Sequence, residues 1–380
     1  MKRFSPSRTQ YPDPSKPPDG EETDENRTEG SKKVKTNQSF ESLFDNETLS
    51  DVIIKINNGQ YMFNAHKMIL GMKSDFLAAK LNELPPCEKD EKPVLCIEEP
   101  PECSEVFSRF LYFIYSGAVW LHRDYVIALQ RLADKYAVRP LLQHCESYIT
   151  QILNDTLCDC DNLQGFPMEV ICDIQEGTFQ SEEVRNLAFQ VLCVHFRRLV
   201  QSDRWKQCNF NLVCNLLKND TCQAEENVIL TSATDWMKKN NLNDKSRIED
   251  ILINIRYPML NRRVLYHLQK NGAFSNFPRV QELVNNAIKY HCFKDIPEAM
   301  DEFVGAQYQA RIHIEPMTTT SNNNHPASPA MRYTNLDTTN ARSQENMELL
   351  NGNESVSENT NVKDRKQYKN HDDTRATSGY

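Results

Sequence analysis

The stretch LSDVIIKINNGQYMFNAHKMIL, residues 49–70, decides the fold of the first half of the chain. Residues 49–56 are rich in β-branched side chains, which predicts a strand, and residues 60–65 form the return strand. Between them, the Asn-Asn-Gly sequence at 57–59 tolerates positive φ angles and therefore suits a tight turn. We predict a β-hairpin here.

Downstream of the hairpin, strand and helix patterns alternate up to about residue 152. Prolines open two of the predicted helices, and apolar residues recur three and four positions apart within them. The predicted elements are a strand at 94–97, a helix from Pro101 to Gly117, an apolar bridge at 118–121, a helix capped by Asp124, and a helix from Pro140 to about Ile152.

From Asn154 onward, almost every segment has helical periodicity. We therefore predict an all-helical second half without a repeat of fixed period. The helical segments lie near residues 167–177, 181–200, 210–218, 225–239, 245–255, 262–270 and 279–292.

Composition excludes several classes of protein. The chain has 380 residues, which allows two or three domains, and a spread net charge of -9, which argues against general binding of polyanions. Its apolar runs are far too short for a membrane span, and the polar, Pro-rich start lacks the apolar segment of a signal peptide. We therefore expect the 12 cysteines to be free thiols in a reducing compartment.

The two ends of the chain are poor in core-forming residues. Residues 1–38 contain only Phe4 and Val34 from the Leu, Ile, Val and Phe set, and residues 317–380 are rich in Asn, Ser and Thr. Such segments cannot bury enough apolar surface to offset the entropy lost on ordering. We expect both ends to be disordered.

Five linked motifs in the first half resemble the BTB/POZ domain. The motifs are LSDV at 49–52, FNAHKMIL at 63–70, SDF at 74–76, FLYFIYSG at 110–117 and LADKY at 132–136. The segments around 98–117 and 129–136 are most similar to the branch of BTB proteins that includes a secreted galectin-binding glycoprotein. From that branch we take the fold and not the location.

The helical half resembles the BACK domain, which follows BTB in kelch-like proteins. The resemblance rests on LVCNLLKND at 212–220, on Glu225 and Glu226, and on ATDW at 233–236. It implies an α+β BTB/POZ domain followed by an all-α BACK domain, with disordered N- and C-terminal tails. The expected boundaries are 1–38 for the N-terminal arm, 39–152 for BTB/POZ, 153–270 for BACK, 271–316 for a helical extension and 317–380 for the C-terminal tail.

The BTB resemblance implies a homodimer, with apolar surface supplied by a helix that begins near Phe40 and by its neighbours. It also implies that Asp51 and Lys67 approach each other near the dimer pocket, where a buried charge needs a partner. One interpretation is a charged pocket that recruits a ligand or corepressor. The other, which we prefer, is a polar pair that fixes the fold. We expect His66 to act as a capping or packing group.

The same resemblance implies candidate contacts with a cullin-3 scaffold. Relatives that bind it carry an apolar-x-Glu motif, which Leu81-Asn82-Glu83 matches in its letters and Leu84 matches in its register. Tyr115 matches an aromatic position presented to the cullin, with packing at a helix end as the alternative. Residues 169–199 stand where a helix pair extends the cullin contact, although such an apolar stripe is more often core than interface.

Catalytic and metal-binding motifs are weak in this sequence. It has no glycine-rich phosphate loop, no G-x-S-x-G and no H-E-x-x-H, so we expect no enzymatic activity and no cofactor. Thiolates of Cys158, Cys160, Cys145 and Cys172, with His144, could form a zinc site. Because C-x-C lacks the usual chelate spacing, we prefer free thiols at a domain junction.

These inferences favour a non-enzymatic, dimeric adaptor that brings an unidentified client to a cullin-3 ubiquitin ligase in the cytoplasm. The rivals are an oligomerisation scaffold without a ligase, a nuclear transcriptional cofactor and a secreted binder. The basic run at 32–35 leaves nuclear entry open, with a solvated charge run as the preferred interpretation. We expect no direct binding of nucleic acid or membrane, and any client would be held by the BACK surface or the tails.

Overall fold

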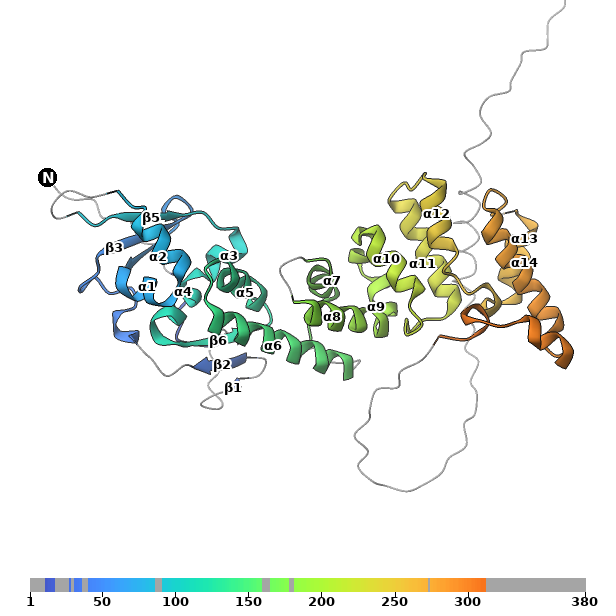
Figure 1. Ribbon diagram of the computed structural model, residues 1–380, viewed down its shortest axis with the longest axis horizontal. Helices are drawn as coiled ribbons and strands as arrows, with labels where there is room; N and C mark the ends of the chain where they lie inside the picture. Colours follow the sequence, from blue (N-terminus) through green and yellow to red (C-terminus); the bar gives the residue numbers. More distant parts are fainter. Residues whose placement is uncertain are drawn as a thin grey trace, which may run out of the picture.

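The computed structural model describes residues 11–17, 27–28, 31–35, 40–85, 91–158, 165–177, 181–272 and 274–311. A mixed half of strands and helices precedes an all-helical half, and the two lie along the long axis of the molecule (Figure 1). The expected tail at 317–380 lies outside the described residues, as does Cys160 of the metal hypothesis.

The predicted hairpin is confirmed and lies in a three-stranded sheet of order β4-β3-β5. Strands β3 (Val52–Ile56) and β4 (Tyr61–Ala65) pair antiparallel, and β5 (Val94–Ile97) pairs parallel to β3. In the turn, Asn58 and Gly59 have φ angles of 56° and 95°. Alternate side chains of β3, those of Val52, Ile54 and Ile56, have 0% exposure and form the core face of the sheet.

The first helices of the mixed half are α1 (Lys67–Lys73), α2 (Asp75–Asn82), α3 (Pro101–Glu105) and α4 (Phe107–Ser116). The single helix predicted from Pro101 to Gly117 is therefore two helices, interrupted at Val106, whose φ and ψ of -101° and 4° lie outside the helical region. Helix α4 is buried along its whole length and ends at Gly117, whose φ of 67° suits a residue without a Cβ.

The expectation of disorder over residues 1–38 is wrong for its described parts. Strands β1 (Arg27–Thr28) and β2 (Ser31–Lys35) form a second sheet with β6 (Ala118–His122), the segment predicted as an apolar bridge. Val34 is 7% exposed, whereas the lysines on either side of it point outward. This alternation lets a basic segment cover one edge of an apolar strand.

A second described piece of the N-terminal region, residues 11–17, also contacts the mixed half. The Tyr11 hydroxyl donates to Asp45 at 2.5 Å, and Tyr11 packs on Phe63 with ring centroids 5.0 Å apart. The indole N–H of Trp120 donates to the carbonyl of Ser15 at 3.2 Å. An aromatic anchor and backbone carbonyls thus hold a segment that lacks aliphatic residues.

Helices α5 (Val126–Lys135) and α6 (Arg139–Cys158) complete the mixed half. Asp124 does not cap α5 as predicted, because Tyr125 occupies the N-cap position and the Asp124 carboxylate lies 3.2 Å from the His122 ring. Helix α6 continues past the predicted end at Ile152 and packs against α8 of the helical half (Figure 1). It therefore joins the two halves.

All regular elements in the described residues of the second half are helices, as predicted. Its elements are α7 (Met168–Glu176), α8 (Glu182–Val194), α9 (Phe196–Gln201), η3 (Asp203–Gln207), α10 (Phe210–Lys218), α11 (Glu226–Lys239), α12 (Lys245–Leu252), η4 (Tyr257–Met259), α13 (Arg262–Lys270), α14 (Pro278–Phe293), η5 (Pro297–Glu302) and η6 (Ala306–Tyr308). Buried Trp205 and Trp236 lie in its core, and both indole N–H groups donate to backbone carbonyls, those of Ser232 and Cys208.

Candidate functional site

Large apolar side chains are exposed on α1 and just before β3. Met68 and Met72 on α1 are 71% and 59% exposed, and Leu49 is 82% exposed. Because the two methionines are four residues apart, they share one face of the helix. A hydrogen bond of 3.0 Å between the His66 ring and the carbonyl of Thr48 holds Leu49 next to the start of α1. We call Leu49, Met68 and Met72 the α1 apolar face.

The conformation of Leu49 also distinguishes this face. Its φ angle is 60°, in the left-handed region, which is unfavourable for a bulky residue. A strained backbone that presents an exposed leucine is uncommon unless surrounding contacts hold it in place. The α1 apolar face is therefore a candidate surface for another protein.

A buried network of His66 and Tyr115 supports the α1 apolar face from inside. The Tyr115 hydroxyl accepts the backbone N–H of His66 at 2.9 Å and lies 3.1 Å from Nδ1 of the same residue. Since Nε2 faces the carbonyl of Thr48, it must carry the proton, which leaves Nδ1 to accept from Tyr115. His66 is thus a buried packing residue that links the start of α1 to the core.

Tyr115 was a predicted contact with a partner, and its position contradicts that role. The side chain has 0% exposure, and burial raises its pKa well above the ordinary value. It therefore offers no surface to a partner, which agrees with the alternative of packing at a helix end. The identity of its partner, His66, could have been suspected only from the motif around 63–70.

The predicted pair of Asp51 and Lys67 takes a different form. The Asp51 carboxylate accepts the backbone N–H of Lys67 at 2.8 Å, so it caps the first turn of α1. Asp51 is exposed, unlike the wall of a buried charged pocket. This arrangement corresponds to the preferred interpretation, a polar contact that fixes the fold.

Phe40 begins a single 3₁₀ turn, η1 (Glu41–Leu43), and not the helix predicted there. Its N–H donates to the carbonyl of Tyr115 at 2.6 Å, and its side chain is half-buried against the core. Phe40 is therefore tied to the same network as His66 and contributes little free surface of its own.

The predicted cullin contacts around α2 are divided between surface and core. Leu81 is only 7% exposed, and Leu84 packs partly on the core, whereas Glu83 is exposed and pairs with Lys80 at 2.8 Å. Sequence reasoning did not single out Phe76 on α2, which is 37% exposed and packs edge-on against Tyr136. Phe76, Glu83 and Leu84 are thus the accessible candidates here.

The helix pair formed by α7 and α8 is largely core. Val184, Val191 and Leu192 are buried, as expected when an apolar stripe faces the interior. Of the thiols in the metal hypothesis, Cys145 and Cys172 are buried, and burial raises the pKa of Cys145, whereas Cys158 is exposed. In the part of the chain that the structure describes, no group of three His, Cys, Asp or Glu side chains could hold a metal ion.

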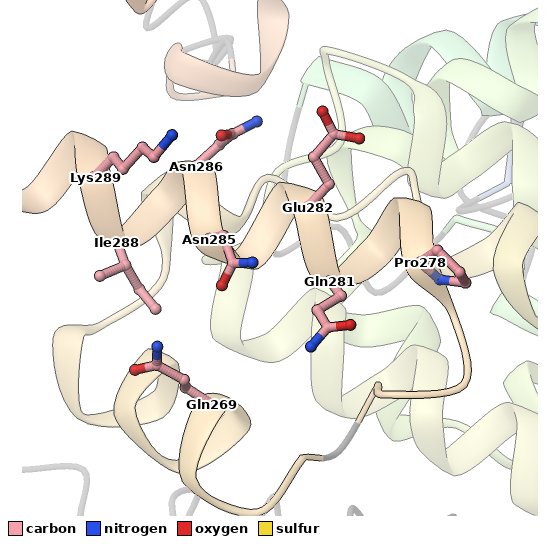
Figure 2. Close-up of a pocket in the computed structure, with 8 residues that line it drawn as sticks. All are labelled: Gln269, Pro278, Gln281, Glu282, Asn285, Asn286, Ile288 and Lys289. Atoms are coloured by element: carbon pink, nitrogen blue, oxygen red, sulfur yellow. The ribbon is translucent and has the colours of Figure 1, made fainter.

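A surface depression of about 590 Å³ lies between α13 and α14. Figure 2 shows Gln281 and Asn285 pointing from α14 toward the side of Gln269, whereas Glu282 and Lys289 point the opposite way. Because the charged groups do not converge, this depression has no arrangement suited to acid–base chemistry.

None of the helices in the described ranges has the length and apolar character needed to cross a bilayer.

Comparison with known proteins gives two family matches. The family described as "BTB/POZ domain" matches residues 40–153, which cover the mixed half from Phe40 to α6. The family described as "BTB And C-terminal Kelch", or BACK, matches residues 177–270, which cover α8 to α13. The expected boundaries assigned residues 154–176 to BACK, and these lie outside both matches.

Similar curated proteins include BTB/POZ domain-containing protein 17 of Xenopus laevis, which is 26% identical over 262 residues, covering 66% of this chain and 52% of the relative. Kelch-like protein 7 of Homo sapiens is 22% identical over 260 residues, covering 68% of this chain and 41% of the relative. Kelch-like protein 28 of Homo sapiens is 21% identical over 257 residues, covering 67% and 42%. The chain thus matches about half the length of these relatives or less.

Both matches fall on the domains that the folded elements define, in the order BTB and then BACK. The chain therefore contains a BTB/POZ domain followed by a BACK domain, and it is similar to BTB/POZ domain-containing and kelch-like proteins.

Proposed function

We propose that this chain is a non-enzymatic, cytoplasmic adaptor that forms a homodimer through its BTB domain and brings a client protein to a cullin-3 ubiquitin ligase. The observation that carries the proposal is the α1 apolar face. Three large apolar side chains, more than half exposed, lie on α1 or next to its start, in a domain whose relatives are interaction modules. Exposed apolar clusters of this kind mark protein–protein contacts.

A two-fold dimer suits this face because a symmetric interface needs only one self-complementary patch. Met68 and Met72 would meet their counterparts across the two-fold axis, and flexible methionines adapt well to such a contact. The buried network of His66 and Tyr115 would hold the face in position without touching the partner.

The ligase contact would lie on the other exposed side chains of the BTB domain, Phe76, Glu83 and Leu84. This part of the proposal rests on the family resemblance and on the partial exposure of Phe76. An aromatic ring that is anchored on one edge by Tyr136 and open on the other is suited to a hot-spot contact. The client would bind the BACK surface.

The experiment is calorimetric titration of the full chain with an N-terminal fragment of cullin-3, with the mass of the chain measured by light scattering. We expect micromolar or tighter binding that Phe76→Ala weakens. The matched control is Phe293→Ala, since Phe293 is 46% exposed but lies on α14, outside the BTB domain. Circular dichroism verifies that both variants are folded.

A dimer that gives no heat with cullin-3 would remove the ligase from the proposal and leave an oligomerisation scaffold. Leu81 and Tyr115 are buried, so two of the four cullin contacts that the resemblance implies are not accessible. This favours the oligomerisation scaffold as the second candidate function. A chain that is monomeric at all concentrations would overturn both candidates.

A further inference from the structure

Arg311 inserts into the BACK domain, although it lies beyond the family match that ends at residue 270. Its Nε and Nη2 donate to the two carboxylate oxygens of Glu226, each at 3.0 Å. The guanidinium also donates to the carbonyls of Asn219 at 2.7 Å and Asn254 at 3.2 Å. The side chains of Arg311 and Glu226 are 2% and 3% exposed, so this is a buried, fork-to-fork ion pair.

A second arginine holds the backbone that precedes Arg311. Arg256 donates from Nη1 to the carbonyl of Gln309 at 2.9 Å and pairs with the carboxylate of Asp220. Its backbone N–H donates to Glu226 at 2.8 Å. Glu226 therefore links the first turn of α11, the segment after α12 and the end of the described chain.

The segment from Val304 to Ala310 has little apolar burial to hold it in place. Val304 is 76% exposed, and most residues from 304 to 310 are exposed. The exceptions are Tyr308, whose ring lies 5.5 Å from that of Tyr290, and Gln307, which donates to the carbonyl of Ile253 at 3.2 Å. The docked position thus depends chiefly on two polar anchors, the Arg311 side chain and the carbonyl of Gln309, which Arg256 binds.

The chemistry of the pocket selects a guanidinium. Without Arg311, the buried carboxylate of Glu226 would keep the backbone N–H of Arg256 as a donor, which is poor compensation for a desolvated charge. The two carboxylate oxygens and two backbone carbonyls fit the planar fork of an arginine, whereas a lysine ammonium cannot reach both oxygens in parallel. The pocket on the BACK domain is accordingly suited to an arginine side chain.

We propose that the pocket formed by Glu226, Asn219 and Asn254 is a binding site for an arginine-bearing extended peptide, and that residues 305–311 occupy it as a releasable intramolecular latch. Release exposes the site to an arginine of another polypeptide. Most residues from 305 to 310 are exposed, and the deeply buried side chain of the latch is that of Arg311 at its end. Exchange between the latch and an arginine-bearing peptide is therefore feasible. This proposal is independent of dimerisation and of the ligase.

The test uses the full chain and a fluorescein-labelled peptide of residues 305–311 with an amidated end, followed by fluorescence anisotropy. We expect the Arg311→Ala chain to bind the peptide, and the wild-type chain to bind it at least about tenfold more weakly, because its own latch competes. A peptide with alanine in place of the arginine should not bind. In Arg311→Ala, the further change Glu226→Gln should abolish binding.

Arg263→Ala is the matched control, since it removes an exposed arginine of α13 and should behave as wild type. If circular dichroism shows that Arg311→Ala does not fold, Arg311→Lys replaces it, with the same expected order of affinities. Hydrogen exchange should rise in residues 219–226 of the folded variant and fall again when unlabelled peptide is added. The proposal is overturned if the folded variant does not bind the peptide, or if wild type binds it equally well.

Discussion

Replacing Met68 and Met72 together by glutamine should weaken the proposed dimer without unfolding the chain. Glutamine has a similar length and helix propensity, so α1 should persist. Full burial of an exposed methionine is worth about 2 kcal/mol. Scaled by exposed fractions of 71% and 59%, burial of both side chains amounts to about 2.6 kcal/mol per protomer and about 5 kcal/mol per dimer.

Glutamine keeps roughly half of the apolar surface of methionine, so about 2.5 kcal/mol should be lost, which corresponds to a dissociation constant roughly 50- to 100-fold higher. Desolvation of the two amides adds to the loss. Sedimentation equilibrium over a wide range of protein concentrations measures the dissociation constant directly. The control is Met300→Gln, since Met300 is 46% exposed but lies in η5.

If the double variant dimerises with the dissociation constant of the wild type, Met68 and Met72 do not lie in the dimer contact. The same holds if Met300→Gln weakens the dimer as much, because the effect would then not belong to the α1 apolar face.

Three further predictions concern stability and the N-terminal strand. Tyr115→Phe should lower the free energy of unfolding of the BTB domain by about 2 to 4 kcal/mol in urea, because it leaves the N–H and Nδ1 of His66 unsatisfied, whereas Tyr266→Phe, 56% exposed, should change it little. Burial, with a smaller effect of Arg198, lowers the pKa of His195 from its ordinary value of 6.5. Because the unfolded chain then binds more protons than the folded chain, the urea midpoint should fall as the pH drops from neutral through 6.5. The fall should be smaller in His195→Gln. Val34→Asp should detach β2 and speed amide exchange in β6, and an unchanged exchange rate would count against this pairing.

The hairpin could be predicted because its information is local. Alternation in β3 and the Asn-Asn-Gly turn act over neighbouring residues, and the fold obeys both. Strand β2 was missed because its three lysines suggested a solvated run, while its partner β6 lies far along the chain. The alternation of Lys33, Val34 and Lys35 could have suggested a strand. Such a short alternation predicts a strand only when the partner strand that it pairs with is known.

The candidate site illustrates a second reason for failure. The motif that ends α4 matches an aromatic position that relatives present to a partner, but the sequence does not say on which side of the backbone the ring of Tyr115 lies. The hydrogen bonds to His66, 49 residues away, hold the Tyr115 ring in the core. Arg311 is a stronger case, because its carboxylate partner is 85 residues distant and nothing near it in the sequence marks it as buried.

The buried network also determines how variants of this domain should be interpreted. His66 is bound at once to Tyr115, which lies in the core, and to Thr48, which precedes the exposed Leu49. A change at Tyr115 therefore moves the start of α1, and with it Met68, although Tyr115 touches no partner. Loss of binding in a Tyr115 variant would report this displacement, whereas loss of binding in a Met68 or Phe76 variant that keeps its stability would report the surface itself. Variants of Met68 and of Phe76 can therefore separate the proposed dimer contact from the proposed ligase contact, whereas a Tyr115 variant cannot.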